Sequence, residues 1–437
     1  MYMRLMNEME DFEALRINPK RVEPWEDQRR APATKNSWDL WIFDAVLDDG
    51  RHLTVNFSTK PFGKIRSGKD LPTIEMTVTD GGEVHHTVRS FDPVDCTYGE
   101  DGCSIGFDDC SAKGDLRTYE IETPGDEDAA SFTITNLTKP FRPGTGVFDF
   151  GHDARDYFGI VCPVTRGEIS GTVTVDGETT EIHGLARHLH LWGNVPPTVW
   201  NHGLVAWQYA DDATLMIMDL TSARNSGFVR YPMCFVQNSR GTVVFDSTFD
   251  AHCTSEIVKE SDDAPTKVHY VFESPDGSTV TYDLEADGSV TPQNLDVAKA
   301  IGTTHGTVCE FDTQGDATLE RPKREDRRSR RRERIMEARR EQLSPDEPNN
   351  GAENDAAPDA KPETTETDAS DDASKAASGG DNAAANETAD EIYDPAGYGL
   401  SEKVTTSARG DGMCTFVLFG KTYHVEHSPQ VQTEYLF

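Results

Sequence analysis

The sequence lacks any long apolar run. Across 437 residues, no segment approaches the ~20 consecutive apolar residues that a membrane-spanning helix requires. The opening residues, MYMRLMNEMEDFEALRINPKR, carry acidic side chains from Glu8 onward and have no continuous apolar stretch, which argues against a secretory signal. We therefore expect a soluble, cytoplasmic protein with no transmembrane segment.

Basic residues are also scarce. The chain has 42 Lys and Arg against 77 Asp and Glu, which gives a formal net charge of −35. A surface with this balance repels phosphate backbones and anionic lipid headgroups. The composition therefore excludes nucleic acid as a general partner.

Signatures of cofactor and disulfide chemistry are missing as well. The eight cysteines are scattered and include no C-x-x-C pair, so we expect reduced thiols. The sequence contains no P-loop, no GxGxxG after a strand, no GxSxG and no HExxH. We therefore expect any activity to be independent of a cofactor.

Short strand-like runs make up most of the chain. Residues 38–59, WDLWIFDAVLDDGRHLTVNFST, are two runs rich in aromatic and β-branched residues joined by Asp48-Asp49-Gly50, a strong hairpin signal. Similar runs recur between turn signals at 73–84, 117–123, 131–137, 167–184, 204–220, 241–249, 266–285 and 413–427. This pattern predicts a mostly β protein built from antiparallel barrels or sandwiches.

Two segments near the C-terminus depart from this pattern. In Arg321–Arg340, eleven of twenty positions are Lys or Arg, which favours a solvated helix. This helix either pairs with the acidic tract behind it or docks on an acidic or anionic partner. Residues 346–389 have no aromatic side chain and too little apolar surface to fold, so they are expected to be disordered.

The length predicts two folded domains with these segments inserted. We divide the chain into a charged leader (1–30), an N-terminal β-domain (31–195), a C-terminal β-domain (196–315 with 400–437), a basic helix (316–345) and a disordered acidic insertion (346–392).

The stretch GLARHLHLWGNVP, residues 184–196, carries the most distinctive side chains. On a strand, His188, His190 and Trp192 share one face, while Leu189 and Leu191 share the other.

Three interpretations of the two histidines remain open. They are hydrogen-bonded interior residues, or two ligands of a metal with His183 or His202 as the third, or acid/base groups in an apolar pocket. No carboxylate or cysteine lies at a supporting short spacing, so our assignment includes no metal.

Two acidic residues stand alone among apolar neighbours. Asp219 lies in LMIMDL and Asp44 in WIFDAVL. A carboxyl group in such surroundings has its pKa raised by desolvation and can donate a proton near neutral pH. Acid/base catalysis beside the histidines therefore has a candidate donor in Asp219.

Three motifs in succession resemble a known family. They are SWDLWIFDAVLDDGRHLTVNFSTKP (37–61), DYFGIVCPVTRGEISGTVTVDGETTEIHGLARHLHLWGNVP (156–196) and VAWQYADDATLMIMDL (205–220). Their order is similar to that of the carotenoid 1,2-hydratase (hydroxyneurosporene synthase) and AttH-like group, to which tocopherol cyclases and fungal Diels–Alderases are similar in architecture. The resemblance implies two consecutive lipocalin-like β-barrels with a pocket for a long apolar substrate.

The resemblance also implies roles for residues. In the hydratase branch an acid protonates a carbon–carbon double bond and water adds to the resulting cation. On that mapping, Asp219 donates the proton, Trp192 stabilises the cation and His190 orients the water or the acid. We expect the substrate to contact a set of neighbouring polar and aromatic side chains: His188, Asp44, Trp41, Trp207 and Tyr209.

The sequence therefore predicts a cofactor-independent hydratase or isomerase, a hydro-lyase or isomerase by class. Its substrate would be hydrophobic: an isoprenoid, fatty-acid-like or polyketide molecule with a carbon–carbon double bond. A cyclase of a polyene substrate is the nearest enzymatic alternative. A non-catalytic lipocalin-like lipid-binding protein is the alternative from another class.

Overall fold

The structure is a computed structural model. It describes residues 3–32, 34, 36–61, 68–80, 83–151, 156–195, 199–210, 213–238, 240–248, 252–259, 265–274, 278–297, 304–320, 412–418, 421–428 and 431–436. The chain divides into one unit of Met1–Lys323 with Ala396–Phe437 and another of Arg324–Pro395. The Arg321–Arg340 segment and the predicted insertion at 346–392 lie outside the described residues.

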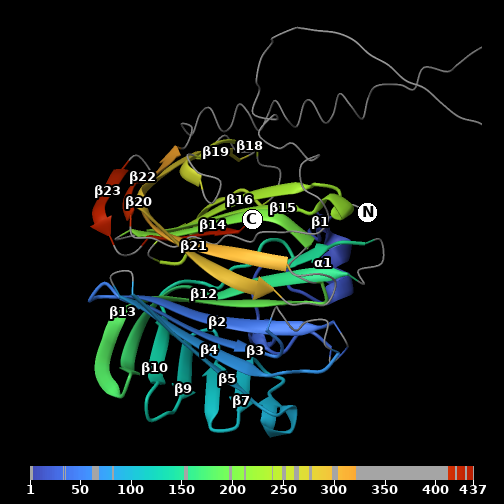
Figure 1. The fold of residues 1–437 in the computed structure, drawn as a ribbon. Coiled ribbons are helices and arrows are strands. Elements are labelled where there is room, and N and C mark those ends of the chain that lie inside the picture. Colours follow the sequence, from blue (N-terminus) through green and yellow to red (C-terminus); the bar gives the residue numbers. More distant parts are fainter. Residues whose placement is uncertain are drawn as a thin grey trace, which may run out of the picture. The chain divides into compact units, whose positions relative to one another are not determined.

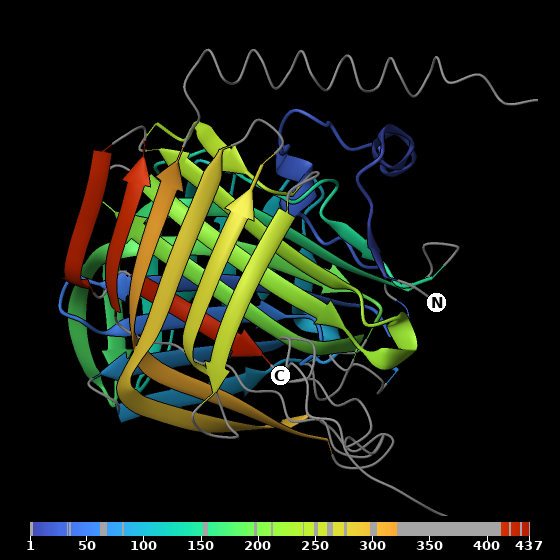
Figure 2. The same ribbon diagram turned by 90° about the horizontal axis from the view of Figure 1, so that it is seen from above.

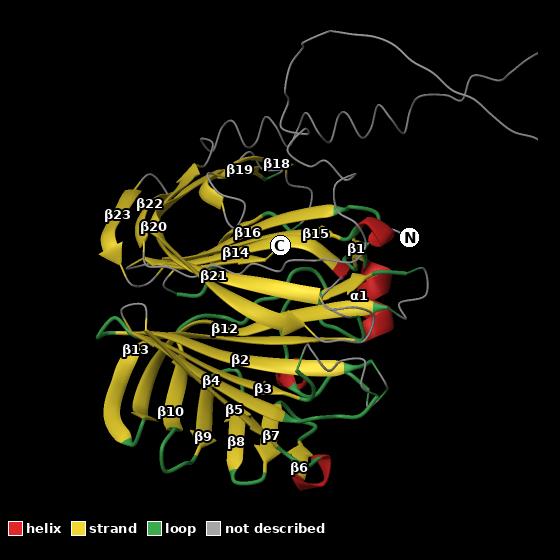
Figure 3. Ribbon diagram, in the orientation of Figure 1, coloured by secondary structure: helices red, strands yellow, loops and turns green. Residues whose placement is uncertain are grey.

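Strands dominate the described residues, as Figure 3 shows, and every strand pair in them is antiparallel. The expected mostly β, lipocalin-like fold class is therefore confirmed. Residues 316–320, predicted as the start of the basic helix, instead end strand β21 (Thr304–Glu320), because they pair with residues 279–283 of β20 (Thr279–Val297).

The first sheet contains thirteen strands. Along its main path the order is β5-β4-β3-β2-β13-β12-β10-β9-β8-β7-β6, with β1 and β11 added beside β12. The strands are β1 (Arg4–Leu5), β2 (Trp38–Leu47), β3 (His52–Ser58), β4 (Thr73–Asp80), β5 (Glu83–Ser90), β6 (Cys96–Tyr98), β7 (Cys103–Phe107), β8 (Cys110–Gly114), β9 (Thr118–Thr123), β10 (Ala129–Asn136), β11 (Val147–Asp149), β12 (Tyr157–Val175) and β13 (Glu178–Gly193).

Turn chemistry explains the hairpins of this sheet. Asp48-Asp49-Gly50 joins β2 to β3, and Gly50 has a φ of 91°. Asp176 and Gly177, with φ of 51° and 79°, join the long strands β12 and β13, which fits a turn that requires positive φ at both central positions. The hairpins predicted at 38–59 and 167–184 are both present.

The first sheet curls around an apolar core (Figure 1). In β9, Tyr119 and Ile121 are buried while Glu120 and Glu122 are exposed, which is the alternation of a strand with one face on a core. Phe57 of β3 and Phe107 of β7 lie far apart in the strand order, yet their ring centroids are 5.6 Å apart. The interior of this sheet is therefore filled by side chains.

The predicted leader packs against this sheet. It contains β1, helix α1 (Met9–Leu15) and the short 3-10 helix η1 (Pro24–Asp27). The α1 helix begins at a reciprocal cap between Glu8 and Asp11 and ends at Arg16, whose φ is 57°. The last residue of η1, Asp27, is fully buried, so this segment contributes a charged group to the interior of the first sheet.

Residues after 199 form further sheets. One has the order β17-β16-β15-β14-β24, another the order β18-β19-β20-β21, and β22 pairs with β23. Figure 2 shows the strands coloured yellow to red side by side. Their bounds are β14 (Trp200–Ala210), β15 (Ala213–Ser222), β16 (Arg230–Asn238), β17 (Val243–Asp246), β18 (His252–Lys259), β19 (Pro265–Glu273), β22 (Gly412–Leu418), β23 (Lys421–Ser428) and β24 (Val431–Leu436). Two more 3-10 helices are η3 (Pro93–Asp95) and η5 (Arg224–Ser226).

The first sheet and the β14–β15–β16 sheet share a second apolar cluster. It includes Trp38 and Phe158 from the first sheet and Met216 and Phe235 from the second. The indole Nε1 of Trp207 donates to the carbonyl oxygen of Thr165 at 3.0 Å across the same contact. In the part of the chain that the structure describes, no helix has both the length and the apolar character needed to cross a bilayer.

Candidate functional site

Strand β13 separates its side chains as its alternation predicts. His188 and His190 point into the first sheet, where they stack on Phe43 and Trp41 of β2 with ring centroids 4.2 and 4.5 Å apart. Leu189 lies on the opposite face, in the cluster shared with the second sheet. The stacking follows from the register, because His188 and His190 stand directly opposite Phe43 and Trp41.

His188 is fully buried between two acceptors. Its Nδ1 lies 2.9 Å from the carbonyl oxygen of Ile42, and its Nε2 lies 3.2 and 3.1 Å from the two carboxylate oxygens of Asp27. The phenol of Tyr119 donates to Oδ2 of the same carboxylate at 2.7 Å. Asp27 thus accepts a hydrogen bond from Tyr119 on β9 and faces the imidazole of His188 on β13.

His190 is fully buried as well. Its Nε2 lies 3.1 Å from Oδ1 of Asp39, and its Nδ1 lies 3.5 Å from Oδ1 of Asp27. Burial lowers the pKa of His190, although the hydrogen bond and charge of Asp39 act in the opposite direction. Asp39 also accepts hydrogen bonds from the backbone N–H groups of Arg30 and Ala31. The network therefore ties the N-terminal segment to β2 and β13.

Trp192 completes this face of β13. Its ring lies 5.2 Å from that of His190, and the guanidinium carbon of Arg30 is 4.5 Å from its centroid. Arg30 also lies over Trp25 at 4.9 Å, so the cation is held between two indoles. Trp192 is buried, and the cation over its ring belongs to the protein itself.

A second group of predicted residues lies on the opposite face of the first sheet. Asp44 accepts from Nε and a terminal nitrogen of Arg187 at 3.0 and 2.6 Å, and the two residues are register partners on β2 and β13. The guanidinium carbon of Arg187 lies 4.9 Å from the ring centroid of Trp207. Tyr209, nearby on β14, is buried, and the guanidinium carbon of Arg166 lies 5.8 Å from its ring centroid.

Asp219 belongs to a third group, on the inner side of the second sheet. It is fully buried, and its two oxygens accept from Nε and a terminal nitrogen of Arg230 at 2.8 and 2.6 Å. Tyr270 of β19 donates its phenolic proton to Oδ2 at 2.8 Å. Asp219 pairs with Pro232 in the ladder, so Arg230 is its diagonal neighbour on the same face of β16.

Arg230 links this group to β18 and to the exterior. Its side chain is about a third exposed, at 36 %, and a terminal nitrogen donates to Ser255 at 2.7 Å. Burial alone would lower the pKa of Arg230, but the hydrogen bond and charge of Asp219 outweigh it and raise that pKa. Nearby, burial raises the pKa of the Cys253 thiol to about 12. Asp219 thus holds the guanidinium of Arg230 in place, and part of the Arg230 side chain remains exposed to solvent.

The structure brings some predicted residues together and separates others. His188, His190, Trp192 and Trp41 share one network, and Asp44 shares the Arg187 contact with Trp207. Asp219 has no hydrogen bond, ion pair or ring contact with His190 or Trp192 among the described residues.

Several partners of the predicted residues were missed from the sequence. They are Asp27, Asp39, Tyr119, Arg230 and Tyr270. Asp39 had a local signal, since it stands in SWDLW as Asp44 stands in WIFDAVL. The other four partners lie in segments that are distant in sequence or that carry no pattern typical of a buried residue.

A hollow of about 580 Å³ lies elsewhere, at the open edge of the first sheet. It is lined by residues 87–89 of β5 together with Asp109, residues 124–126 and Asp128. Arg89 spans it by donating to the carbonyl oxygen of Pro124 at 2.6 Å and to Asp109 at 3.1 Å. Its polar lining differs from the apolar pocket that the family resemblance implies.

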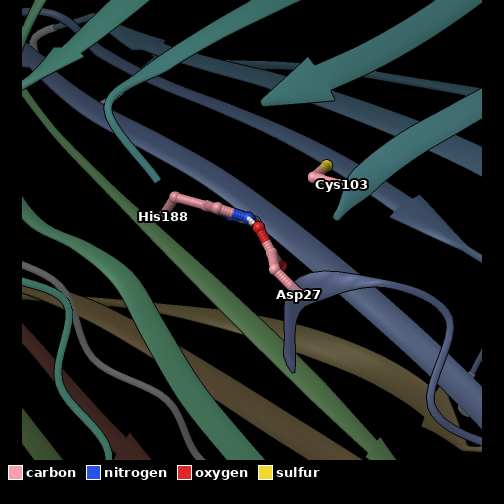
Figure 4. Close-up of side chains that lie close together, drawn as sticks. All are labelled: Asp27, Cys103 and His188. Carbon is pink, nitrogen blue, oxygen red and sulfur yellow. Dashed lines mark hydrogen bonds and ion pairs between the residues drawn. The ribbon is translucent and has the colours of Figure 1, made fainter. Parts of the chain in front are cut away.

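Two sets of described side chains have the composition of metal ligands. One is Asp27, Cys103 and His188, all buried (Figure 4); the other is His85, Asp128 and Asp176 at the surface. His183, a third ligand expected from the sequence, is exposed and lies five residues from His188, on the opposite face of the strand. The side chain of His202 lies outside the described residues.

A curated relative has a detectable sequence match to the chain. No family model matches the chain. The Diels-Alderase ucsH of Acremonium sp. is 22% identical over 197 residues, which cover 40% of this chain and 47% of that protein. The chain thus matches about half the length of this curated relative.

Several solved structures also resemble the chain. A structure of an AttH-like protein from Nitrosomonas europaea is 13% identical, with a TM-score of 0.46, and the match covers 68% of this chain and 94% of that one. A structure of CghA with Sch210972 is 13% identical, with a TM-score of 0.47, and the match covers 72% and 94%. The resemblance predicted from the three sequence motifs is confirmed by the curated match, because a Diels-Alderase belongs to the predicted group.

Proposed function

We propose that the protein is a cofactor-independent enzyme that acts on a carbon–carbon double bond of a hydrophobic substrate, and that Asp219 and Arg230 carry the chemistry. The relative with a curated activity is a Diels-Alderase, which supports catalysis on such a substrate. The single observation that carries the assignment to this site is the bidentate pair, in which a fully buried carboxylate holds a partly exposed guanidinium.

The surroundings of the pair suit a hydrophobic substrate. Asp219 follows Leu215 and Ile217 on the same face of β15, and both are fully buried. Tyr270 and Phe272 of β19 are fully buried on the other side, with ring centroids 5.5 Å apart. The carboxylate side of the pair therefore lies in a low dielectric, which strengthens its hold on the guanidinium.

The pair can activate a double bond that is conjugated to a carbonyl group. Arg230 donates to Asp219 and Ser255 through Nε and one terminal nitrogen, and the described residues place no partner on its other terminal nitrogen. A guanidinium N–H that donates to a substrate carbonyl oxygen draws electron density from the conjugated alkene. It also stabilises the enolate oxygen that forms when a nucleophile adds.

In a hydration, water oxygen bonds to the β-carbon and the π electrons move onto the carbonyl oxygen, which Arg230 holds. The water then loses a proton, and the α-carbon gains one as the carbonyl is restored. In an isomerisation, a proton leaves one carbon and another returns to the far end of the enolate. In both reactions the guanidinium of Arg230 stabilises the negative charge that develops on the carbonyl oxygen.

Asp219 is better suited to position Arg230 than to donate a proton. It accepts three hydrogen bonds, two from Arg230 and one from Tyr270. The two contacts with Arg230 are with a guanidinium, which can only donate, so they hold the ionised form of the carboxyl group. In this proposal Asp219 fixes the direction of the guanidinium. His190 and Trp192, whose contacts lie within the first sheet and the N-terminal segment, support the fold.

Ring closure is the second candidate reaction. It is favoured by the match to a Diels-Alderase, and the same cation would activate an alkene bearing a carbonyl group toward a diene of the same molecule. Hydration adds the mass of water and ring closure leaves the mass unchanged, so the product mass separates hydration from the other reactions.

The test measures turnover and binding separately. The purified protein is incubated with a panel of apolar polyenes that carry a conjugated ketone, and products are identified by chromatography with mass spectrometry. Arg230→Lys keeps a charge beside Asp219 but loses the bidentate geometry, so we expect kcat/KM to fall about 10²-fold. Substrate binding, measured by tryptophan fluorescence, should change only a few fold.

Arg224→Lys is the matched control, because Arg224 is exposed in the 3-10 helix η5 and makes no side-chain hydrogen bond to the described residues. It should retain full turnover. Binding without turnover by the wild-type protein would indicate a carrier and contradict the proposal. Unchanged turnover in a folded Arg230→Lys protein would remove Arg230 from the mechanism.

A further inference from the structure

The carboxylate of Asp27 faces two imidazole nitrogens inside the first sheet. Its Oδ1 lies 3.2 Å from Nε2 of His188 and 3.5 Å from Nδ1 of His190. All three residues are fully buried. Figure 4 shows the Asp27 and His188 side chains pointing toward one another, with Cys103 beside them on β7.

The other nitrogen of each imidazole fixes where its proton lies. Nδ1 of His188 must donate, because the carbonyl oxygen of Ile42 can only accept. Nε2 of His190 is turned to the carboxylate of Asp39 and donates in the same way. Two neutral imidazoles would therefore both direct a lone pair at the carboxylate of Asp27. A donor is therefore missing between these groups, and either a proton or a metal ion can supply it.

His190 supplies an independent sign of a ligand. Its Nδ1 is fully buried and makes no hydrogen bond to any described residue; the carboxylate of Asp27 is its ion-pair neighbour. A buried nitrogen without a hydrogen bond is costly unless something else binds it. It is aimed at the same carboxylate oxygen as His188.

The spacing of these atoms fits a tetrahedral ion. Two ligand atoms that each lie ~2.1 Å from such an ion are roughly 3.4 Å apart. The separations of 3.1 and 3.2 Å at His188 and 3.5 Å at His190 bracket that value. A charge-assisted hydrogen bond would bring His188 closer, to about 2.8 Å.

Cys103 adds a sulfur ligand. Its Sγ lies within 4.8 Å of the ligand atoms of Asp27 and His188. The thiol is fully surrounded by protein, and its only hydrogen bond in the described residues is a 3.9 Å contact with the carbonyl oxygen of Ala112. A metal–sulfur bond would replace a weak contact, and the thiol proton would leave as the metal binds.

We propose that Asp27, Cys103 and His188 form a buried zinc site, beside Nδ1 of His190, which makes no hydrogen bond to the described residues. Zinc is the ion that a mixed nitrogen, oxygen and sulfur set of this size prefers. The backbone carbonyl of Ile42 on Nδ1 of His188 is the supporting contact that metal-bound histidines commonly have. Because every ligand is buried, the site would be structural.

The site would tie together three segments that are distant in sequence. Asp27 ends η1, Cys103 begins β7 and His188 lies in β13, 161 residues from Asp27. The ion would hold the N-terminal segment inside the curled sheet. Its role is independent of the Asp219–Arg230 pair and of the proposed enzymatic activity.

The test loads the full-length protein with zinc, removes excess by dialysis and counts bound metal by mass spectrometry of the elements. Wild-type protein should retain about one zinc per chain. Cys103→Ser and His188→Gln should each lose most of it. The matched control is Cys110→Ser, which changes a thiol that is equally buried on the adjacent strand β8 but lies outside the ligand set.

Cobalt gives a second readout that does not depend on stability. Cobalt bound to wild-type and Cys110→Ser protein should show a sulfur-to-cobalt charge-transfer band in the near ultraviolet, and Cys103→Ser protein should lack it. Wild-type protein that retains neither ion after loading would overturn the proposal. Equal zinc in the Cys103→Ser and wild-type proteins, both folded by circular dichroism, would also overturn it.

Discussion

Two of the buried acidic clusters among the described residues differ in how exposed the partners of their carboxylates are. Around Asp27 and Asp39, both imidazoles and the phenol are enclosed, and every group lies against another part of the first sheet. Around Asp219 the carboxylate is equally buried, but its cation, Arg230, is partly exposed. In our proposal the enclosed first cluster supports the fold, and the second offers the cation of Arg230 to a substrate.

The largest difference is expected in stability. Asp27→Asn removes a charge that faces two imidazoles and a phenol without access to water, so we expect the free energy of unfolding to fall by about 3 kcal/mol or more. Asp219→Asn leaves its partner Arg230 able to reach water, and we expect a loss nearer about 1 kcal/mol. Urea denaturation of both variants measures the difference. Equal losses would mean that the two clusters have the same structural role.

A smaller effect is expected where Trp192 packs against the backbone. A Cβ atom on Gly159 would lie 2.0 Å from Cε2 of Trp192, whose ring is held by Arg30 and His190. Gly159→Ala should therefore destabilise the protein by about 1–3 kcal/mol.

The control for this prediction is Gly106→Ala. There the close neighbour is Oγ1 of Thr97, at 2.6 Å, on a side chain that can rotate. We expect it to cost less than about 1 kcal/mol. If the Gly159→Ala protein were as stable as the control, the Trp192 side chain would be able to move aside, which would contradict its fixed packing against Arg30 and His190.

The sequence predicts the parts of this structure that depend on local chemistry. The hairpin at Asp48-Asp49-Gly50 follows from glycine at a positive φ, and the shared face of His188, His190 and Trp192 follows from the two-residue repeat of a strand. The resemblance to the AttH-like group likewise depends on the order of motifs in the sequence.

Long-range pairing was beyond the reach of the sequence. Asp27 meets His188 only because a short helix inserts into the curled sheet, and no local pattern marks Asp27 within PWEDQRR. Arg230 stands in GFVRYP with no sign that it would lie diagonally across a ladder from Asp219. The spacing of ligands in the sequence also argued against a metal, because the carboxylate and the thiol come from distant segments.

The most direct test of the central claim uses a matched pair of substrates, one with the conjugated ketone and one with a methylene group in its place. If Arg230 acts by donating to the carbonyl oxygen, the wild-type protein should prefer the ketone in kcat/KM well beyond the ratio of their uncatalysed rates, and Arg230→Lys should lose most of that preference. A preference that is the same in both proteins would contradict the account, because it would show that the carbonyl group is recognised elsewhere.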